Sequence, residues 1–137
     1  MWNQRAIFLG NSMAPKKLHD LQESATQLRA AIDLFRDSSK KQADLHFLTI
    51  SKAFEILVEV AWKHLKQRVQ DEGLDAPSPK EAIRQATRIK FISDPEFWIA
   101  CINARNDSVH NYFGISKKDY VELAEKFLEV ICHYIKQ

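Results

Sequence analysis

Apolar residues recur at steps of three and four along almost the whole chain, and this spacing limits the fold more than any other feature. The first such run begins after Pro15 and comprises Leu18, Leu21, Ala25, Leu28, Ile32 and Phe35. Because an α-helix turns once every 3.6 residues, these side chains share one face of a helix. We therefore predict an amphipathic helix that ends near residues 37–39.

A longer run at about residues 42–71 repeats this spacing, with apolar residues on more than one face. Its members are Leu45, Leu48, Phe54, Leu57, Ala61, Leu65 and Val69. We predict a long central helix with several neighbours, which Gly73 ends. Glu59 and Lys63 stand in the favourable i,i+4 order, worth roughly 0.2–0.5 kcal/mol, and are interpreted as part of a solvated charged face.

Three capping motifs mark the starts of the remaining helices. Ser78-Pro79-Lys80-Glu81 opens a short helix to about residue 91, and Ser93-Asp94-Pro95-Glu96 opens the next helix. Ser116 with Asp119 precedes the last helix, whose apolar register runs from Tyr120 to Tyr134.

These segments predict an all-α fold: an up-and-down four-helix bundle with one extra short helix. The scarcity of glycine (3) and proline (4) disfavours an all-β fold, which needs many tight turns. A length of 137 residues fits one domain. Residues 1–13 lack periodicity and are expected to form a flexible arm, which leaves residues 14–137 as a single helical-bundle domain.

Composition narrows the possible partners and compartment. A formal charge of +2 is too small to indicate nucleic-acid binding, so such a function must rest on a local site. Cys101 and Cys132 lack metal-ligand spacing and are interpreted as reduced thiols of a cytoplasmic protein. No apolar run reaches the roughly 20 residues that span a bilayer. We expect no metal, no cofactor and no membrane association.

The predicted short helix carries the most basic stripe of the chain. Lys80, Arg84 and Arg88 fall on one of its faces. Such a stripe is usually a solvated surface, but it would bind RNA phosphates if it bordered a cleft.

The segment from Arg105 to Tyr112 carries the chemically distinctive residues. Asn106 and His110 stand at i,i+4, whereas Arg105 and His110 are five positions apart, about 140° around a helix. Arg105 and His110 could converge through the reach of arginine, a distorted helix end or a second copy. Alternatively, they only cap carbonyl groups at the helix end.

Histidine and arginine together suit metal-independent RNA cleavage. His110 could take the proton of a 2′-hydroxyl, and Arg105 could stabilise the charge that develops on the attacked phosphate. Asn106 could position the phosphate or the His110 ring, and Tyr112 could stack on a base or present its hydroxyl.

The pattern R-x4-H-x-Y formed by Arg105, His110 and Tyr112 resembles the hallmark of the HEPN superfamily. Within it, the chain is similar to the nucleotidyltransferase substrate-binding proteins and the HepT-type toxins. The likeness extends in order through residues 53–66, 78–84 and 91–98, and covers roughly residues 42–135.

The resemblance implies a homodimer in which two motifs face a shared cleft. It implies a ribonuclease toxin with catalytic Arg105 and His110 and a supporting Asn106. A minimal nucleotidyltransferase antitoxin would be its partner and would attach AMP to Tyr112. Asp107 departs from the Thr or Ser found near this position in many members. Two further interpretations stay open: a noncatalytic substrate-binding subunit of a two-component nucleotidyltransferase, and a structural helical adaptor.

Overall fold

The computed structural model describes residues 15–110 and 116–137, and this part of the chain forms five helices and no strand. The side chains of residues 15, 16 and 107–110 are also outside the description. The predicted flexible arm at residues 1–13 therefore lies outside the described residues.

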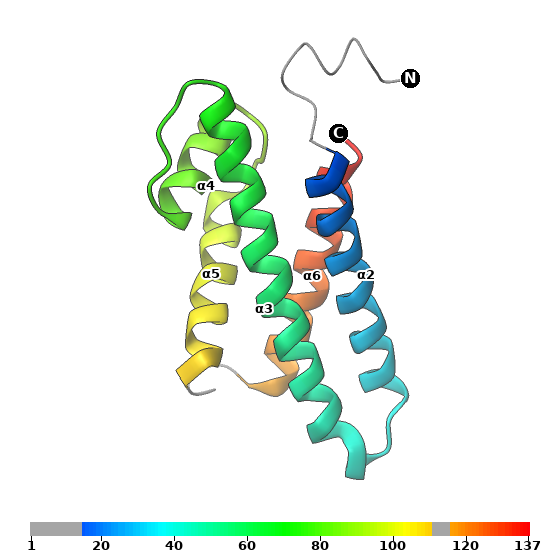
Figure 1. The fold of residues 1–137 in the computed structure, drawn as a ribbon. Helices are drawn as coiled ribbons and strands as arrows, with labels where there is room; N and C mark the ends of the chain where they lie inside the picture. Colours follow the sequence, from blue (N-terminus) through cyan, green and yellow to red (C-terminus); the bar gives the residue numbers. More distant parts are fainter. Residues whose placement is uncertain (1–14, 111–115) are drawn as a thin grey trace.

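Four helices of the described chain alternate in direction, and a fifth, short helix covers one end (Figure 1). The helices are α2 (Pro15–Asp37), α3 (Lys40–Asp71), α4 (Pro79–Arg88), α5 (Pro95–His110) and α6 (Lys117–Ile135). The central helix α3 contacts the other four. The short helix α4 lies beside the C-terminal end of α3 and the N-terminal half of α5. The predicted helical bundle with one short helix is confirmed.

The predicted capping residues begin their helices as expected. Ser78 Oγ accepts a hydrogen bond from the backbone N–H three residues on, at 3.2 Å, and Ser116 Oγ does the same at 3.1 Å. Asp94 Oδ1 accepts the equivalent bond from Phe97 at 3.1 Å. Each cap satisfies a backbone N–H that has no partner within its helix, which is worth about 1 kcal/mol.

Two helices end in the same way with different residues. Gly73, at φ 84°, ends α3 as predicted, and the N–H of Leu74 bonds back to the carbonyl of Val69. The prediction that α4 runs to residue 91 was wrong, because α4 ends at Arg88 and Lys90 adopts φ 66°. This left-handed residue turns the chain, as glycine usually does at this position.

Aromatic side chains join three of the helices in the core. Phe54 of α3 meets Tyr120 and Phe127 of α6 edge to face, with ring centroids 5.3 and 5.8 Å apart. Trp98 of α5 meets Phe127 at 5.2 Å. These contacts fix α5 against the α3–α6 pair and thereby position the residues that follow along α5.

Part of the apolar pattern of α3 remains uncovered. Leu45, Leu48 and Ile56 are 63%, 53% and 38% exposed, and we call these three residues the outer α3 stripe. For Leu45 and Leu48, the expectation of neighbouring helices is wrong within the described chain. Helical geometry puts Glu59 on the same face as this stripe. No helix among the described residues is long and apolar enough to cross a membrane.

Candidate active site between helices α3 and α5

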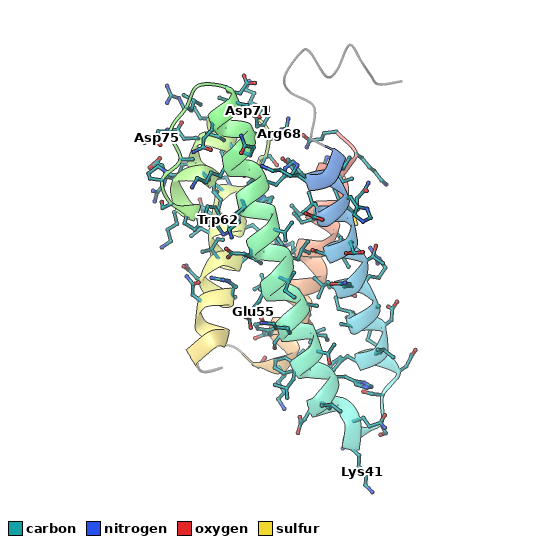
Figure 2. All side chains as sticks on the ribbon, viewed as in Figure 1. Lys41, Glu55, Trp62, Arg68, Asp71 and Asp75 are labelled. Atoms are coloured by element: carbon teal, nitrogen blue, oxygen red, sulfur yellow. The ribbon has the colours of Figure 1, made fainter. Side chains whose placement is uncertain are left out.

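Arg105 reaches from α5 to α3, where it pairs with Glu59. Arg105 Nη2 lies 2.9 Å from Glu59 Oε1, and each side chain is 31% exposed. Trp62 and Glu55, which flank Glu59 along α3, lie on the side of α3 that faces α5 (Figure 2). The pair is therefore open to solvent at the junction of the two helices.

Two residues of α3 hold the Glu59 carboxylate from its own helix. Lys63 Nζ lies 3.0 Å from Oε2, which confirms the predicted i,i+4 pair, and Trp62 Nε1 donates to Oε1 at 3.2 Å. Burial raises the pKa of Glu59, but hydrogen bonds from Lys63 and Trp62 and the charge of Arg105 outweigh it, so the pKa is lowered overall. Glu59 is thus ionised at neutral pH and lies between two cations.

Asn106 also contacts the arginine. Its Oδ1 accepts a hydrogen bond from Arg105 Nη1 at 3.1 Å, and its side chain is exposed. The guanidinium is therefore bound through both terminal nitrogens, by Glu59 from α3 and by Asn106 from α5. Such bonds fix its plane, which suits it to receive a planar or tetrahedral anion.

His110 and Tyr112 complete the motif in sequence. The backbone of α5 is helical from Pro95 through His110, so the angle of about 140° between the Arg105 and His110 positions is retained. A distorted helix end is thereby excluded as the means of bringing them together. The His110 side chain and all of Tyr112 lie outside the described residues.

The basic stripe of α4 lies away from the Arg105 pair. Lys80, Arg84 and Arg88 are exposed, with Arg84 Nη1 4.0 Å from a Glu81 oxygen and Arg88 donating to Gln85 at 3.4 Å. Helix α4 packs beside the N-terminal half of α5, whereas Arg105 is in its C-terminal half (Figure 1). RNA would have to extend along α5 to touch both.

A buried polar cluster, which the sequence reasoning missed, joins α3 to α6. Tyr134 Oη lies 3.0 Å from both His64 Nδ1 and Arg68 Nη1. The Arg68 guanidinium stacks 3.7 Å from the Phe91 ring centroid. Burial, together with the charges of Arg68 and Lys17, lowers the pKa of His64 to about 4. The signal was present in the sequence, since His64 follows Ala61 at a three-residue step on the apolar face of α3.

The described chain holds two thiols and no cluster of metal-binding side chains. Cys101 is buried and Cys132 is half-buried, and both are free thiols. Burial and the nearby charge of Asp94 raise the pKa of Cys101 well above its usual range. Within residues 15–110 and 116–137, no group of three His, Cys, Asp or Glu side chains could hold a metal ion. The candidate site in the described chain is therefore the Arg105 guanidinium, held by Glu59, with the Asn106 amide beside it.

Comparison with protein families gives a match. A family model described as "Nucleotidyltransferase substrate binding protein like" matches residues 16–137, nearly the whole chain. No curated protein matches it.

Proposed function

The chain belongs to the nucleotidyltransferase substrate-binding-protein-like family, and from this premise we propose that it is a metal-independent ribonuclease toxin whose active site forms between two copies. Arg105 and His110 are its catalytic residues, and Asn106 supports them. The observation that carries the proposal is the fixed, solvent-open Arg105 on a helix that continues unbroken to His110.

A second copy of the chain would supply the histidine that a single α5 cannot bring to its own Arg105. Positions 140° apart on one straight helix face different directions, but a two-fold axis brings Arg105 of one copy to His110 of the other. The outer α3 stripe supports this dimer, because three exposed apolar side chains lie on the face that also carries Glu59. Exposed apolar surface next to a polar site is typical of a subunit contact.

In the proposed reaction, His110 takes the proton of a ribose 2′-hydroxyl. The 2′-oxygen then attacks the adjacent phosphorus, and the bond to the 5′-oxygen breaks as that oxygen takes up a proton from water, leaving a 2′,3′-cyclic phosphate and a 5′-hydroxyl. Arg105 stabilises the charge that the phosphate oxygens gain. Glu59 is a positioning residue, since it holds Arg105 without touching the RNA.

Mixing two inactive variants tests the shared site. Arg105→Ala and His110→Ala should each abolish cleavage and growth arrest, whereas His133→Ala, an exposed histidine on α6, should retain both. In a mixed dimer of the two inactive variants, one site has both residues intact and the other has neither. An equal mixture after subunit exchange should therefore recover about one quarter of wild-type cleavage.

Three outcomes would contradict the proposal or its chemistry. Failure of the mixture to recover any cleavage, with the mixed dimer verified by mass, would refute the shared site. Growth arrest by His110→Ala equal to that of the wild type would refute the catalytic role. Cleavage products that carry a 5′-phosphate would exclude attack by the 2′-oxygen.

Tyr112 is proposed as the point of control. A partner minimal nucleotidyltransferase would transfer AMP from ATP to the tyrosine oxygen and release pyrophosphate. The added phosphate and adenine would then block RNA from Arg105. Mass spectrometry after co-expression should show Tyr112 heavier by AMP; detoxification that persists in Tyr112→Phe would reject this mechanism.

The α4 stripe is proposed to bind RNA backbone away from the reacting bond. Replacing Lys80, Arg84 and Arg88 by alanine should weaken RNA binding and lower the salt dependence, by up to about 0.7 per lost contact with single-stranded RNA. If the salt dependence of RNA binding is the same in the triple variant and the wild type, these residues do not contact RNA and are only solvated surface. The chemical step under saturating RNA should stay the same.

The alternative is a noncatalytic, cytoplasmic subunit that binds substrate for a nucleotidyltransferase. The family description favours it, and so does the pairing of Arg105 with Glu59, which leaves the arginine partly neutralised. This alternative predicts a stable complex with the nucleotidyltransferase and no RNA cleavage by the purified chain. Cleavage that disappears in His110→Ala would decide against it.

A further inference from the structure

The indole ring of Trp62 is held beside the Arg105 guanidinium through one shared oxygen. Glu59 Oε1 accepts a hydrogen bond from Trp62 Nε1 at 3.2 Å and lies 2.9 Å from Arg105 Nη2. The two nitrogens cannot be farther apart than these two distances together, about 6.1 Å. The N–H edge of the ring is thus turned toward the ion pair, which fixes the ring relative to the guanidinium.

Part of the Trp62 ring remains open to solvent. The side chain is half-buried and packs against the core from outside. Lys66 Nζ lies over the ring, 5.8 Å from its centroid. A cation–π contact reaches to about 6 Å and is weak at an exposed site, so this ammonium covers the ring only loosely. Because lysine has a flexible four-carbon stem, another group can take its place over the ring while the charge stays nearby.

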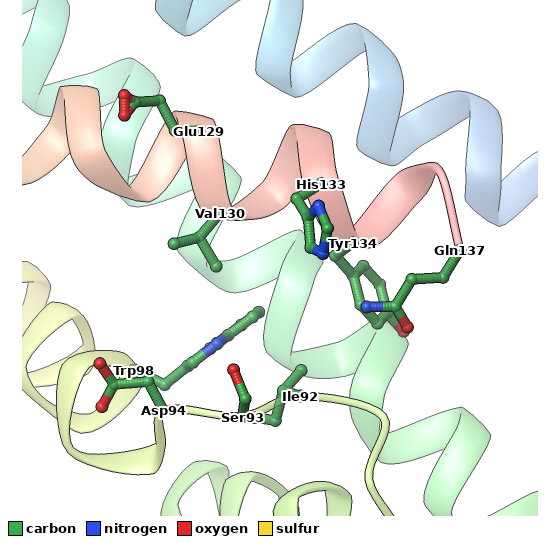
Figure 3. A pocket seen from close by; sticks show the side chains of 9 residues that line it. All are labelled: Ile92, Ser93, Asp94, Trp98, Glu129, Val130, His133, Tyr134 and Gln137. Atoms are coloured by element: carbon green, nitrogen blue, oxygen red, sulfur yellow. The ribbon is translucent and has the colours of Figure 1, made fainter.

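Trp98, the other tryptophan in the described part of the chain, offers no such surface. It is 2% exposed, and its ring lies between the 92–94 segment and α6 (Figure 3). There it meets Phe127 edge to face, with ring centroids 5.2 Å apart. Trp98 therefore belongs to the core, whereas Trp62 keeps an accessible ring at the candidate site.

We propose that Trp62 stacks on an unpaired base of the RNA strand whose phosphate binds Arg105, so that the site takes RNA in single-stranded form. The inference rests on the proposed function for its ligand. An aromatic ring can stack on any base, because every base has a π face, and such a contact strengthens binding by about fivefold to a hundredfold. A base in an A-form duplex is already stacked and paired, so it is not available to the ring.

The charges around the ring suit a base that carries a phosphate. Lys63 and Lys66 flank Trp62 along α3, and Arg105 approaches from α5. Glu59 is the carboxylate that contacts this group, so three cations surround one anion. A nucleotide that places its base over the ring can place its phosphate among these cations.

Binding can be measured apart from cleavage in the His110→Ala variant, which lacks the proposed base. A single-stranded RNA of about 12 nucleotides, a length within the usual range for such sites, is compared with an abasic strand of the same length and charge. Both are titrated at one salt concentration, because phosphate contacts depend on salt. The abasic strand has nothing to stack, so it should bind at least fivefold more weakly.

Two replacements of Trp62 isolate the ring. Trp62→Phe keeps a flat ring and Trp62→Leu keeps only apolar volume, and both lose the hydrogen bond to Glu59. In the His110→Ala background, Trp62→Leu should reduce the preference for RNA over the abasic strand to within about twofold, whereas Trp62→Phe should retain it. Each preference is a ratio measured within one variant, so a general loss of stability cancels.

Phe97→Leu is the matched control. Phe97 is also a half-buried ring under a lysine, with Lys126 Nζ 5.5 Å from its centroid. It stands eight positions before Arg105 on α5, roughly 12 Å along the helix. Its replacement should leave the preference for RNA over the abasic strand unchanged.

Several results would overturn the inference. These are a preference for RNA that survives in Trp62→Leu, a duplex of the same sequence that binds as tightly as the single strand, or no binding of the single strand at all. Adenosine monophosphate that binds as tightly as the RNA would assign the ring to a free nucleotide and overturn the RNA source.

The two proposals fail separately. Binding that depends on the bases and on Trp62, without cleavage by the wild type, would refute the ribonuclease and support the stacking contact. Cleavage by a wild-type chain that shows no preference for bases would refute the stacking contact alone.

Discussion

Replacing His64 by glutamine should remove a stability loss that the protein otherwise suffers in mild acid. His64 is 4% exposed and its Nδ1 lies 3.0 Å from Tyr134 Oη. Arg68 can only donate, so the tyrosine oxygen accepts from Arg68, and in the His64 tautomer with its proton on Nε2 the tyrosine gives its single proton to Nδ1. The ring is therefore neutral, with its proton on Nε2. Protonation of Nδ1 would break this bond and put a second positive charge beside Arg68.

The magnitude follows from the lowered pKa. Burial and the charges of Arg68 and Lys17 bring the pKa of His64 from 6.5 to about 4. Between these values the unfolded chain binds the proton and the folded chain does not, so stability falls as the pH drops from about 6.5 towards 4. The full effect is about 3 kcal/mol at 1.36 kcal/mol per unit, of which about 2 kcal/mol is lost by about pH 5. For a chain of this length, 2 kcal/mol lowers the Tm by about 7 °C.

Urea unfolding at fixed protein concentration, between about pH 7.5 and pH 5, measures this loss. The wild type should lose about 2 kcal/mol more than His64→Gln across that range, because glutamine can accept from Tyr134 but does not titrate. His133→Gln is the matched control, since His133 is an exposed residue of α6 that forms no ion pair with any described residue, and its replacement should leave the wild-type loss unchanged. An equal loss in His64→Gln and the wild type would refute the reasoning. Glu59 titrates below this range because its pKa is lowered, so it does not affect the comparison.

Three other outcomes follow from the structure. Lys90→Gly should stabilise the fold by about 0.5–1 kcal/mol and Lys90→Ala should not, because only glycine relieves the positive φ; equal urea midpoints for both would contradict this. A thiol reagent near pH 8 should modify Cys132 and spare Cys101 in the folded protein, since burial raises the pKa of Cys101; two equally fast reactions would disprove it. If Arg105 is catalytic, Glu59→Ala should lower kcat by up to about fivefold, which corresponds to an orienting ion pair of about 1 kcal/mol, while Glu59→Gln, which keeps an oxygen for the guanidinium, should stay within about twofold; a kcat of Glu59→Ala equal to that of the wild type would remove the positioning role.

The starts of the helices were predictable from sequence because their signals are local. Ser78, Asp94 and Ser116 each cap a backbone N–H only three residues away, so tertiary structure need not be known. The end of α3 was also predictable, because Gly73 takes the left-handed conformation that glycine tolerates. The end of α4 was not predictable, since Lys90 takes the same left-handed conformation although it is not a glycine.

The contacts of the candidate site were less predictable, because they join distant segments. Glu59 and Lys63 were identified as an i,i+4 pair, and that pair is present. The third member, Arg105, approaches from α5, and no spacing rule relates positions so far apart in the chain. His64 was overlooked for a similar reason: its partner Tyr134 lies on α6, and only the packing of the two helices brings them together.

The pairing of Arg105 with Glu59 bears directly on whether the site can cut RNA. An open ion pair is worth about 1 kcal/mol or less in water, because solvent screens both charges. Exchanging the Glu59 carboxylate for an RNA phosphate therefore costs on the order of fivefold in affinity, at about 1 kcal/mol for a partly exposed pair. Glu59 also keeps contacts with Lys63 and Trp62, so it remains held when Arg105 turns away. The ion pair is thus too weak to block cleavage and strong enough to orient the guanidinium beforehand. If the chain cuts RNA as proposed, catalysis depends on bringing His110 to that guanidinium. A single unbroken α5 does not place the two positions on one face, so the mixed-variant experiment is more decisive than any change to Glu59.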